Sequence, residues 1–465
     1  MSIPRVRFIV AVMVLVAALQ AGCGAPHQVG PSLPQTPPMG WNSWNSRIEL
    51  TEQSVTATID AMVSSGMRDA GYRYVNLDAG WASPQRGPNG ELRTDPSRFP
   101  NGIAAVIRYA HDRGMKFGLY ASPYNEQCSA VPSLASAGHE TLDAKTFADW
   151  GVDYLKYDWC HNAADHQQQV RMFTTMRDAL RATGRPIVYS INPNSSDDHT
   201  AGARYDWSGI ADMARAAADL VPVWHDTLQL LGPFDPFAKG AFIGVPDQFA
   251  AAAKVVAPSK PGYWTDPDMM VIGVPWTGFV ARMFQRVRKH LAVGDLPPDQ
   301  VARLRAVADM SDDEVKRVVA AEPNLTDTEQ RSQLTLWALL SAPLIAGNDV
   351  RTMSPQIRDI LTNRDVIAVD QDPLVQPARP LPADPRVLVK PLSDDAVAVG
   401  LFNSSDNPAT IATTTAAVGL AGATCYRVRD LWAHTDATTS GAIGGGAVPP
   451  HAVTLLRVTP GCSSS

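Results

Sequence analysis

The stretch Val-Asp-Tyr-Leu-Lys-Tyr-Asp-Trp-Cys, residues 152–160, has the pattern of a buried strand that ends in a carboxylate. Lys156 and Asp158 are two residues apart, so both side chains point to the same side of that strand. A lysine in this position keeps the aspartate ionised and available as a nucleophile. An ordinary ion pair at the end of a surface strand explains these residues as well, so the choice depends on the rest of the chain.

Short apolar strands alternate with amphipathic helices from residue 39 to about residue 350. The eight predicted strands are Met39–Trp44, Tyr72–Asp78, Met115–Ala121, Asp153–Asp158, Pro186–Ile191, Ile210–Ala214, Gly262–Asp268 and Leu344–Gly347. Alternation of this kind predicts a parallel sheet, and eight units predict a closed (β/α)8 TIM barrel. A doubly wound open sheet is the alternative, but no Gly-x-Gly-x-x-Gly follows the first strand.

Three of the predicted helices have apolar residues on one face, and Thr51 is the expected cap of the first. The three faces are Val55, Ile59, Met62 and Val63; Ile103, Val106, Ile107 and Ala110; and Met172, Phe173, Met176 and Leu180. Polar residues gather where strands lead into helices: Asn42, Asp78, Tyr120, Asp158, Asn192, Arg215, Asp219, Asp266 and Asp268. A barrel places all these junctions around one rim, where active sites form.

The catalytic domain is predicted over residues 36–380, with two stretches longer than a barrel needs, at 224–260 and 274–324. The second carries helical patterns and follows the seventh strand, so it should cover the active-site rim. A stabilising cap without ligand contact is the alternative. Residues 381–465 are predicted to form an antiparallel β-sandwich, with strands at Val387–Lys390, Ala396–Phe402, Thr424–Asp430 and Val453–Val458.

Composition indicates a globular protein: its 465 residues are 45% hydrophobic, and the net charge is −6. No basic stripe is present, so nothing supports nucleic-acid binding. Residues 1–23 have the form of a bacterial export signal, and residues 24–35 that of a linker. The run Leu-Gln-Ala-Gly-Cys at 19–23 resembles a lipoprotein cleavage box, which makes Cys23 a candidate for lipidation and membrane attachment. Plain secretion and an inert cysteine are the alternatives.

Four cysteines remain once Cys23 is set aside, and an even number in an exported chain suggests two disulfides. Cys128 with Cys160 would join two strand ends near Asp158. Cys425 with Cys462 would close the C-terminal region. No Cys-x-x-Cys or His-x-x-x-His spacing occurs, so a structural zinc site is not expected.

Two carboxylates at strand ends, Asp158 and Asp219, suit glycoside hydrolysis, in which one attacks the anomeric carbon and the other protonates the leaving oxygen. Arg215 lies four residues before Asp219 and could bind a substrate hydroxyl. Five aromatic residues could stack on a sugar ring: Trp41, Trp44, Trp81, Tyr120 and Trp264.

Six ordered segments resemble glycoside hydrolase family 27, the α-galactosidase (melibiase) family. They are Thr-Pro-Pro-Met-Gly-Trp-Asn-Ser-Trp-Asn (36–45), Tyr-Val-Asn-Leu-Asp (74–78), Asp-Pro-Ser-Arg-Phe-Pro-Asn-Gly (95–102), Phe-Ala-Asp-Trp-Gly-Val-Asp-Tyr-Leu-Lys-Tyr-Asp (147–158), Trp-Thr-Asp-Pro-Asp-Met (264–269) and Ala-Val-Asp-Gln-Asp-Pro-Leu (368–374). The resemblance covers about residues 36–460 apart from the insertions.

The resemblance implies a retaining mechanism with Asp158 as nucleophile and Asp219 as acid/base, through the spacing Arg-x-x-x-Asp-Leu-x-x-x-Trp at 215–224. Asp226 is a nearby competitor that lacks an arginine four residues earlier. Cys128 and Cys160 match a family disulfide beside the nucleophile, and no metal or organic cofactor is implied. The positions that match the sugar pocket are Trp44, Asp78, Tyr120, Lys156, Arg215 and Asp268.

Two positions depart from the family pattern. The family usually has paired aspartates after the second strand, but here Asp78 is followed by Ala79. Where animal members have a glutamate near the sugar 2-hydroxyl, this chain has Asn192, which is shorter and uncharged but remains a candidate substrate ligand. The loss of the second aspartate removes a charge-assisted contact worth about 1.5–3 kcal/mol and opens space beside C6.

These departures leave several activities open. Hydrolysis of terminal α-galactosides by double displacement is the first expectation, with an oligo- or polysaccharide substrate. Isomaltodextranase and β-L-arabinopyranosidase activities within the family are alternatives, because one needs room beyond O6 and the other acts on a sugar without a 6-hydroxymethyl group. A non-catalytic glycan-binding lipoprotein is the alternative from another functional class.

Overall fold

The computed structural model describes residues 33–124, 132–161, 163–196, 198–225, 242–255, 259–293, 305, 309–321 and 323–462. The export signal and the candidate lipidation site at Cys23 lie outside these residues, as does Cys128, so those assignments stay predictions. Within the described part, no helix is long and apolar enough to cross a membrane.

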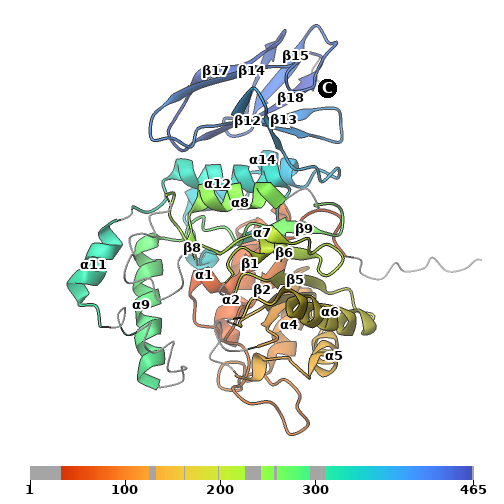
Figure 1. Ribbon diagram of the computed structural model, residues 1–465, viewed down its shortest axis with the longest axis vertical. Coiled ribbons are helices and arrows are strands. Elements are labelled where there is room, and N and C mark those ends of the chain that lie inside the picture. The colour runs from red at the N-terminus through yellow and green to blue at the C-terminus, as the bar shows by residue number, and fades with distance from the viewer. Residues whose placement is uncertain are drawn as a thin grey trace, which may run out of the picture. The chain divides into compact units, whose positions relative to one another are not determined.

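Eight parallel strands form the central sheet of the barrel domain (Figure 1). In sheet order they are β10 (Leu344–Ala346), β1 (Met39–Asn42), β2 (Tyr74–Asn76), β3 (Lys116–Ala121), β4 (Tyr154–Asp158), β5 (Val188–Asn192), β6 (Met213–Arg215) and β9 (Trp264–Asp266). Chain continuation past β9 closes the ring, because Met270 forms a parallel bridge with Ala346 of β10. The predicted TIM-barrel fold and its eight strands are confirmed.

All eight strands are shorter than predicted, most of them because they begin later, and β1 and β2 also end early at the rim. β1 stops at Asn42, whose side-chain oxygen accepts a hydrogen bond from the backbone N–H of Trp44 and caps the short helix α1 (Ser43–Ser46). β2 stops at Asn76, and the backbone N–H of Asp78 then donates to Ser43 Oγ at 2.9 Å. These caps turn the chain at the rim and leave the next side chains beside the barrel mouth.

Amphipathic helices cover the outside of the strands (Figure 1). Thr51 caps α2 (Glu52–Ser64) in a capping box with Ser54, as the sequence predicts for Thr51. In the predicted apolar faces, Val63 and Met172 are only partly buried and every other residue is buried. The remaining helices of this layer are α3 (Met67–Ala70), α4 (Ile103–His111), α5 (Glu140–Trp150), α6 (His166–Ala182) and α7 (Ala201–Arg204), with a 3-10 turn η1 (Pro132–Leu134).

Both long stretches contain structure of their own. In the first, β7 (Asp219–Leu220) pairs in parallel with β8 (Phe242–Ile243), and α8 (Val245–Val255) comes next. In the second, α9 (Trp276–Val293) and α11 (Asp312–Ala321) pack side by side (Figure 1). The barrel ends with α12 (Asp327–Leu340), η4 (Val350–Thr352), α13 (Pro355–Leu361) and α14 (Arg364–Asp370).

Antiparallel strands begin at Arg379 and form the predicted C-terminal sandwich. One sheet has the order β11 (Arg379–Leu381), β12 (Asp384–Pro391), β13 (Val397–Phe402), β18 (Val453–Pro460), β15 (Tyr426–Asp430) and β16 (Thr435–Thr439), and a second pairs β14 (Ala409–Thr414) with β17 (Ala442–Val448). Their apolar faces share a core that includes Val399, Ile411 and Ile443. The predicted Cys425–Cys462 disulfide is present in this domain.

Helix α12 joins the barrel to the sandwich. It is buried on almost every side, with Leu334, Leu336 and Trp337 all inaccessible to solvent. Ser332 Oγ donates to the carbonyl of His451 at 2.7 Å, and Trp432 Nε1 donates to Thr335 Oγ1 at 2.9 Å. The helix therefore serves both hydrophobic cores, which is why its sequence lacks a polar face.

Candidate active site

The register of the parallel strands brings the predicted site residues to one rim. Tyr120 of β3 lies opposite Lys156 of β4, and Asp158 lies opposite Asn192 of β5. Arg215, the last residue of β6, lies opposite Asp266, the last residue of β9. Because all eight strands run the same way, their carboxyl ends place these side chains around one opening.

Lys156 stands between two carboxylates. Its Nζ donates to Asp78 Oδ2 at 2.8 Å and lies 3.6 Å from Asp158 Oδ2. Burial alone would lower the pKa of Lys156, but the charges of Asp158 and Asp78 outweigh burial and raise it. The ammonium group therefore stays charged and connects the segment after β2 to β4 at the rim.

Asp158 is more strongly perturbed than its sequence suggests. Burial raises the pKa of Asp158 to about 7, although the positive charge of Lys156 acts in the opposite direction. The prediction that Lys156 keeps this carboxylate ionised is therefore only partly right, because the lysine offsets part of the desolvation. Asp158 Oδ1 is buried and has no hydrogen-bond partner among the described residues. An oxygen held in this way is available to react with a bound molecule.

Arg215 holds the second predicted catalytic carboxylate. Its Nη2 lies 3.1 Å from Asp219 Oδ1 and 3.1 Å from Asp268 Oδ2, and it donates to the carbonyl of Ala218 at 2.7 Å. The Asp219 side chain is 46% exposed, whereas that of Asp158 is 8% exposed. One carboxylate is thus buried beside a lysine, and the other faces solvent beside an arginine.

Asp268 fixes the segment that carries Asp219. It adopts a left-handed backbone conformation with φ 74°, which costs energy for a residue with a side chain. In that conformation Asp268 Oδ2 accepts the backbone N–H of Leu220 at 2.8 Å, and the backbone N–H of Asp268 donates to Asp266 Oδ1 at 2.8 Å. Burial raises the pKa of both Asp266 and Asp268, and Arg215 counteracts it.

The structure corrects the expectation that five aromatic residues could stack on a sugar. Trp41 and Trp81 are fully buried, and their indole N–H groups donate to the carbonyls of Asn348 and Tyr120. Trp264 is also buried, in a core cluster inside the barrel. Buried rings fill the space between strands and helices, so these three positions serve packing.

Tyr120 is also buried, but the ammonium group of Lys156 lies 5.5 Å from its ring centre, so it belongs to the rim together with Trp44. The Tyr120 hydroxyl lies 3.0 Å from Cys160 Sγ, and burial, followed by the charge of Asp158, raises the pKa of Tyr120, so it stays neutral. Trp44 is partly exposed, and the guanidinium of Arg47 lies 4.7 Å from its ring centre. Arg47 also lies 5.0 Å from the ring centre of Phe279 in α9, so the second insertion does reach the rim.

Asn192 and Ala79 have clear structural surroundings. Asn192 Oδ1 accepts the backbone N–H of Asn194 at 3.0 Å, and its Nδ2 donates to Ser195 Oγ at 2.8 Å, so the amide is already engaged in its own loop. Ala79 is partly exposed, and its backbone N–H donates to Asp78 Oδ1. No carboxylate stands at Ala79 to share a sugar hydroxyl with Asp78.

Cys128 and Asp226 lie outside the described residues, so the Cys128–Cys160 pairing stays a prediction.

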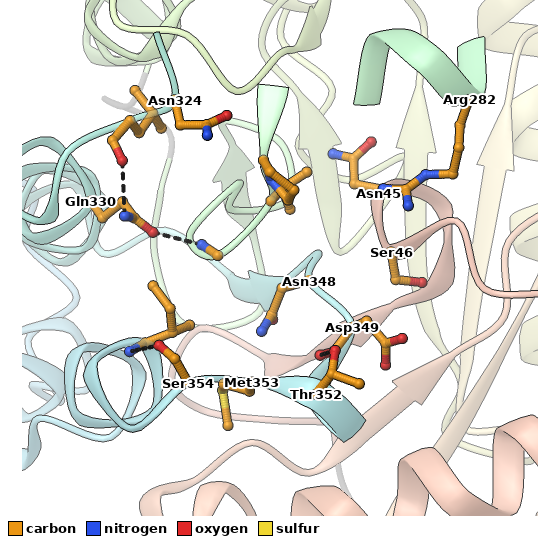
Figure 2. Close-up of a pocket in the computed structure, with 15 residues that line it drawn as sticks. Asn45, Ser46, Arg282, Asn324, Gln330, Asn348, Asp349, Thr352, Met353 and Ser354 are labelled. Atoms are coloured by element: carbon orange, nitrogen blue, oxygen red, sulfur yellow. Dashed lines mark hydrogen bonds between the residues drawn. The ribbon is translucent and has the colours of Figure 1, made fainter. Parts of the chain in front are cut away.

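A separate pocket lies where the second insertion meets α1 and the connection after β10. Figure 2 shows Asn45, Ser46 and Arg282 on one side of it and Gln330 on the other. The cavity measures about 430 Å³, and Gln330 Oε1 accepts the backbone N–H of Gly273 across its wall at 2.7 Å. None of the rim carboxylates lines this pocket. The candidate active site is therefore the rim with Asp158 and Asp219, and not this cavity.

The rim carboxylates are arranged for acid/base and nucleophilic chemistry. In the described part of the chain, the group of side chains with the donors and spacing for a metal ion includes none of them. Their partners are Lys156 and Arg215, which balance negative charge without a metal. Glycoside hydrolysis needs two carboxyl groups with different roles, and Asp158 and Asp219 stand in different environments.

Comparison with known proteins identifies the family. Residues 36–279 and 300–372 match the family model described as Alpha galactosidase A, and residues 383–458 match the Alpha galactosidase C-terminal beta sandwich domain. The chain belongs to the alpha galactosidase A family. The family match spans both structured domains, and it agrees with the family resemblance of the sequence.

Several relatives share most of their length with this family member. It is 33% identical to the alpha-galactosidase of Cyamopsis tetragonoloba over 92% of this chain and 87% of the relative. It is also 33% identical to alpha-galactosidase A of Cellvibrio japonicus, over 84% and 82%. Alpha-galactosidase I from Mortierella vinacea has a similar structure, with a TM-score of 0.72, 28% identity, and coverage of 93% of this chain and 99% of that one.

Some residues that shape the site were not singled out from sequence. Asn194 Nδ2 donates to the carbonyls of Arg215 and Ala217 at 3.1 and 3.0 Å, so it holds the end of β6 in place. Arg47 connects Trp44 to the second insertion. For Asn194 the sequence did contain a signal, because an Asn-Pro-Asn run at 192–194 after a predicted strand indicates a turn. No local sequence pattern marks Arg47.

The raised pKa of Asp158 predicts an acid limb near neutrality. A protonated carboxylic acid does not act as a nucleophile, so kcat/KM should fall about tenfold per pH unit once the pH drops below about 7. An unperturbed aspartate, with a pKa near 3.9, would place this limb about three units lower. Initial rates at low substrate concentration between pH 4 and 9 would locate the limb.

A matched pair of lysine variants tests whether the charge beside Asp158 sets the pH of the acid limb. Lys156→Met should move the limb to higher pH, because the charge that favours ionised Asp158 is removed. Lys116→Met changes a lysine at the opposite end of the neighbouring strand, where it donates to Tyr74, and should leave the limb in place. An acid limb near pH 4 in the unmodified protein would contradict the burial argument.

Proposed function

We propose that this family member is a retaining glycoside hydrolase that cleaves terminal α-galactosides. The observation that carries the proposal is the pair Asp158 and Asp219 at the barrel rim, one buried beside Lys156 and the other exposed beside Arg215. Relatives that are about one-third identical over most of the chain are named alpha-galactosidases, which supports the same substrate class here.

The roles of the two carboxylates follow the family resemblance of the sequence, with Asp158 as nucleophile and Asp219 as acid/base. Asp158 attacks the anomeric carbon as the glycosidic C–O bond breaks, and Asp219 gives its proton to the leaving oxygen. Asp219, now a carboxylate, takes a proton from a water molecule whose oxygen attacks the same carbon and releases Asp158. Two inversions at one carbon give net retention. The exposed position of Asp219 suits this exchange with water, and the buried oxygen of Asp158 suits a bond to the sugar.

The charged neighbours have supporting roles in this scheme. Lys156 and Asp78, joined at 2.8 Å, are placed to bind hydroxyls on one edge of the sugar. Arg215 forms ion pairs with both Asp219 and Asp268, so it fixes the position of the acid/base relative to Asp268. Charge-assisted hydrogen bonds of this kind are the strong ones, and they fix geometry as well as adding energy.

Ala79 favours a second candidate within the same family. Ala79 offers no second carboxylate beside Asp78, so this position does not select for a sugar with a free 6-hydroxymethyl group: a sugar that lacks the group, or one that is extended there, also suits it. β-L-Arabinopyranosides fit the first case, and α-glucans cleaved by an isomaltodextranase fit the second. Arg47 and Phe279, which bring the second insertion to the rim, would line the approach of a longer substrate.

A panel of p-nitrophenyl glycosides separates these candidates. It would contain the α-galactoside, β-L-arabinopyranoside, α-glucoside and α-N-acetylgalactosaminide, with dextran alongside. Highest kcat/KM on the α-galactoside is the expected result. Turnover of dextran or the arabinoside without turnover of the α-galactoside would move the assignment to the second candidate. Binding of sugars without any turnover would favour the glycan-binding alternative.

Ala79→Asp should sharpen the preference for galactosides. The added carboxylate can accept a hydrogen bond from a sugar hydroxyl, and a charge-assisted bond of about 1.5–3 kcal/mol corresponds to about 10–150-fold in kcat/KM. We expect the ratio of α-galactoside to β-L-arabinopyranoside activity to rise by a factor in this range. Ala79→Asn keeps a similar size without the charge and should give a smaller change. A ratio that falls in Ala79→Asp would show that the space beside Asp78 serves another sugar.

A further inference from the structure

Two histidines and an aspartate meet where the barrel contacts the C-terminal sandwich. His225 comes after β7 in the first insertion, Asp406 lies between β13 and β14, and His451 lies between β17 and β18. Asp406 Oδ1 lies 3.1 Å from His225 Nε2 and 2.9 Å from His451 Nε2. One potential ligand atom from each residue lies within 4.8 Å of the other two.

His451 has the second contact that is typical of a metal ligand. Its Nδ1 lies 2.7 Å from Glu329 Oε1, so the carboxylate can accept Nδ1–H and leave Nε2 with a free lone pair. Carboxylate–histidine–metal arrangements fix the ligand in this way. Glu329 is itself held, because its other oxygen accepts the backbone N–H of Thr326 at 2.6 Å in the capping box of α12.

Packing fixes the position of the His451 ring. Trp224 stacks on it with ring centres 4.9 Å apart and an interplanar angle of 18°, and His225 approaches it edge-on at 5.0 Å. The backbone of His451 is left-handed, with φ 58°. Its side chain is 16% exposed, whereas those of His225 and Asp406 are 49% and 74% exposed. One donor is therefore rigid, and the other two can adjust around an ion.

We propose that His225, Asp406 and His451 bind a Zn²⁺ ion that links the barrel to the sandwich. Tetrahedral zinc with bonds of about 2.0–2.1 Å places its ligand atoms about 3.3 Å apart. The two measured separations, 2.9 and 3.1 Å, are close to that value. Two imidazoles and a carboxylate suit zinc, and water from the exposed side completes the fourth position.

The site would act on the segment that carries Asp219. That segment runs from β7 through Trp224 to His225, so an ion bound by His225 ties its end to the sandwich. No local sequence motif indicates such a site, because the three residues are far apart in the chain. His225 and Asp406 are separated by 181 positions, and Asp406 and His451 by 45. The sequence-based expectation that no structural zinc site exists rested on local spacing alone.

Calorimetric titration of Zn²⁺ into the tag-free, chelator-treated protein at neutral pH tests the proposal. One ion per chain is expected. His225→Ala and Asp406→Asn, which each remove a proposed ligand, should weaken Zn²⁺ binding by at least about tenfold. Glu329→Gln keeps the capping box of α12 but changes the contact with His451, so it should weaken Zn²⁺ binding by about tenfold to a hundredfold. The matched control is His434→Ala, because His434 also pairs with an aspartate, Asp365, at 2.9 Å, and it should bind as the unmodified protein does.

Hydrogen exchange gives a second readout that does not depend on hydrolysis. Zn²⁺ should slow amide exchange in residues 219–225 of the unmodified protein and leave it unchanged in His225→Ala. Because Asp406 is exposed, Asp406→Asn should keep its thermal unfolding profile without metal, which separates loss of binding from loss of folding. Absence of Zn²⁺ binding would overturn the proposal. So would equal binding by the unmodified protein and by both ligand variants.

Discussion

Replacing Asp158 by Asn should lower kcat on α-galactosides by about 10⁴-fold or more. The amide has nearly the same shape but cannot form the covalent intermediate, so the loss removes the first chemical step itself. A 10⁴-fold loss corresponds to about 5 kcal/mol of transition-state stabilisation. Because burial already raises the pKa of Asp158, the neutral amide costs no desolvation, and the variant should fold and still bind substrate.

Asp212→Asn is the matched control for that experiment. Asp212 is also a buried aspartate with a pKa raised by burial, but it precedes β6 at the opposite end of the barrel. There its Oδ2 accepts the backbone N–H of Tyr189 at 2.8 Å. This variant should keep kcat within a few-fold of the unmodified protein. Substantial turnover by Asp158→Asn, measured with the same substrate, would remove Asp158 from the nucleophile role.

Replacing Asp219 by Ala should give a loss that depends on the leaving group. For a natural disaccharide, whose leaving alcohol needs a proton, we expect a fall of about 10²–10⁴-fold in kcat/KM. For a dinitrophenyl glycoside, whose leaving group departs as an anion, kcat/KM should fall much less. Parallel measurements on the two substrates would isolate the acid step.

External azide should partly restore turnover of the dinitrophenyl substrate by Asp219→Ala. The Asp219 side chain is 46% exposed, so its removal opens a path for a small anion that needs no base. Asp206→Ala changes an exposed carboxylate in the segment before β6 and should show neither effect. Equal losses on both substrates, without azide rescue, would assign Asp219 a positioning role and leave the acid to be found elsewhere.

Most of the barrel was predictable because its sequence rules are local. Apolar strands that alternate with amphipathic helices predicted all eight strands, and Thr51 predicted the start of α2. Strand ends were less predictable, since a side chain such as Asn42 ends its strand by capping the next helix. In the sandwich, β11, β14, β16 and β17 were missed; runs such as Ala-Ile-Gly-Gly-Gly-Ala-Val (442–448) lack an alternating apolar pattern.

The site was predictable where the spacing of two residues in the sequence determines how their side chains lie in space. Lys156 and Asp158, two apart on a strand, do share one side, and Arg215 does contact Asp219 four residues later. The degree of burial was not predictable, so the raised pKa of Asp158 and the buried rings of Trp41, Trp81 and Trp264 were missed. Contacts between distant segments, such as Arg47 with Phe279, also require the fold.

Covalent labelling with a fluorinated α-galactosyl fluoride, followed by peptide mass spectrometry, tests the central claim most directly. Such a sugar forms the glycosyl-enzyme but hydrolyses slowly, so the nucleophile keeps the label. We predict one fluorogalactosyl group per chain, attached to Asp158 within the peptide that includes Tyr157 and Trp159. A label on another carboxylate, or turnover of α-galactosides by a chain that never becomes labelled, would contradict the proposed mechanism.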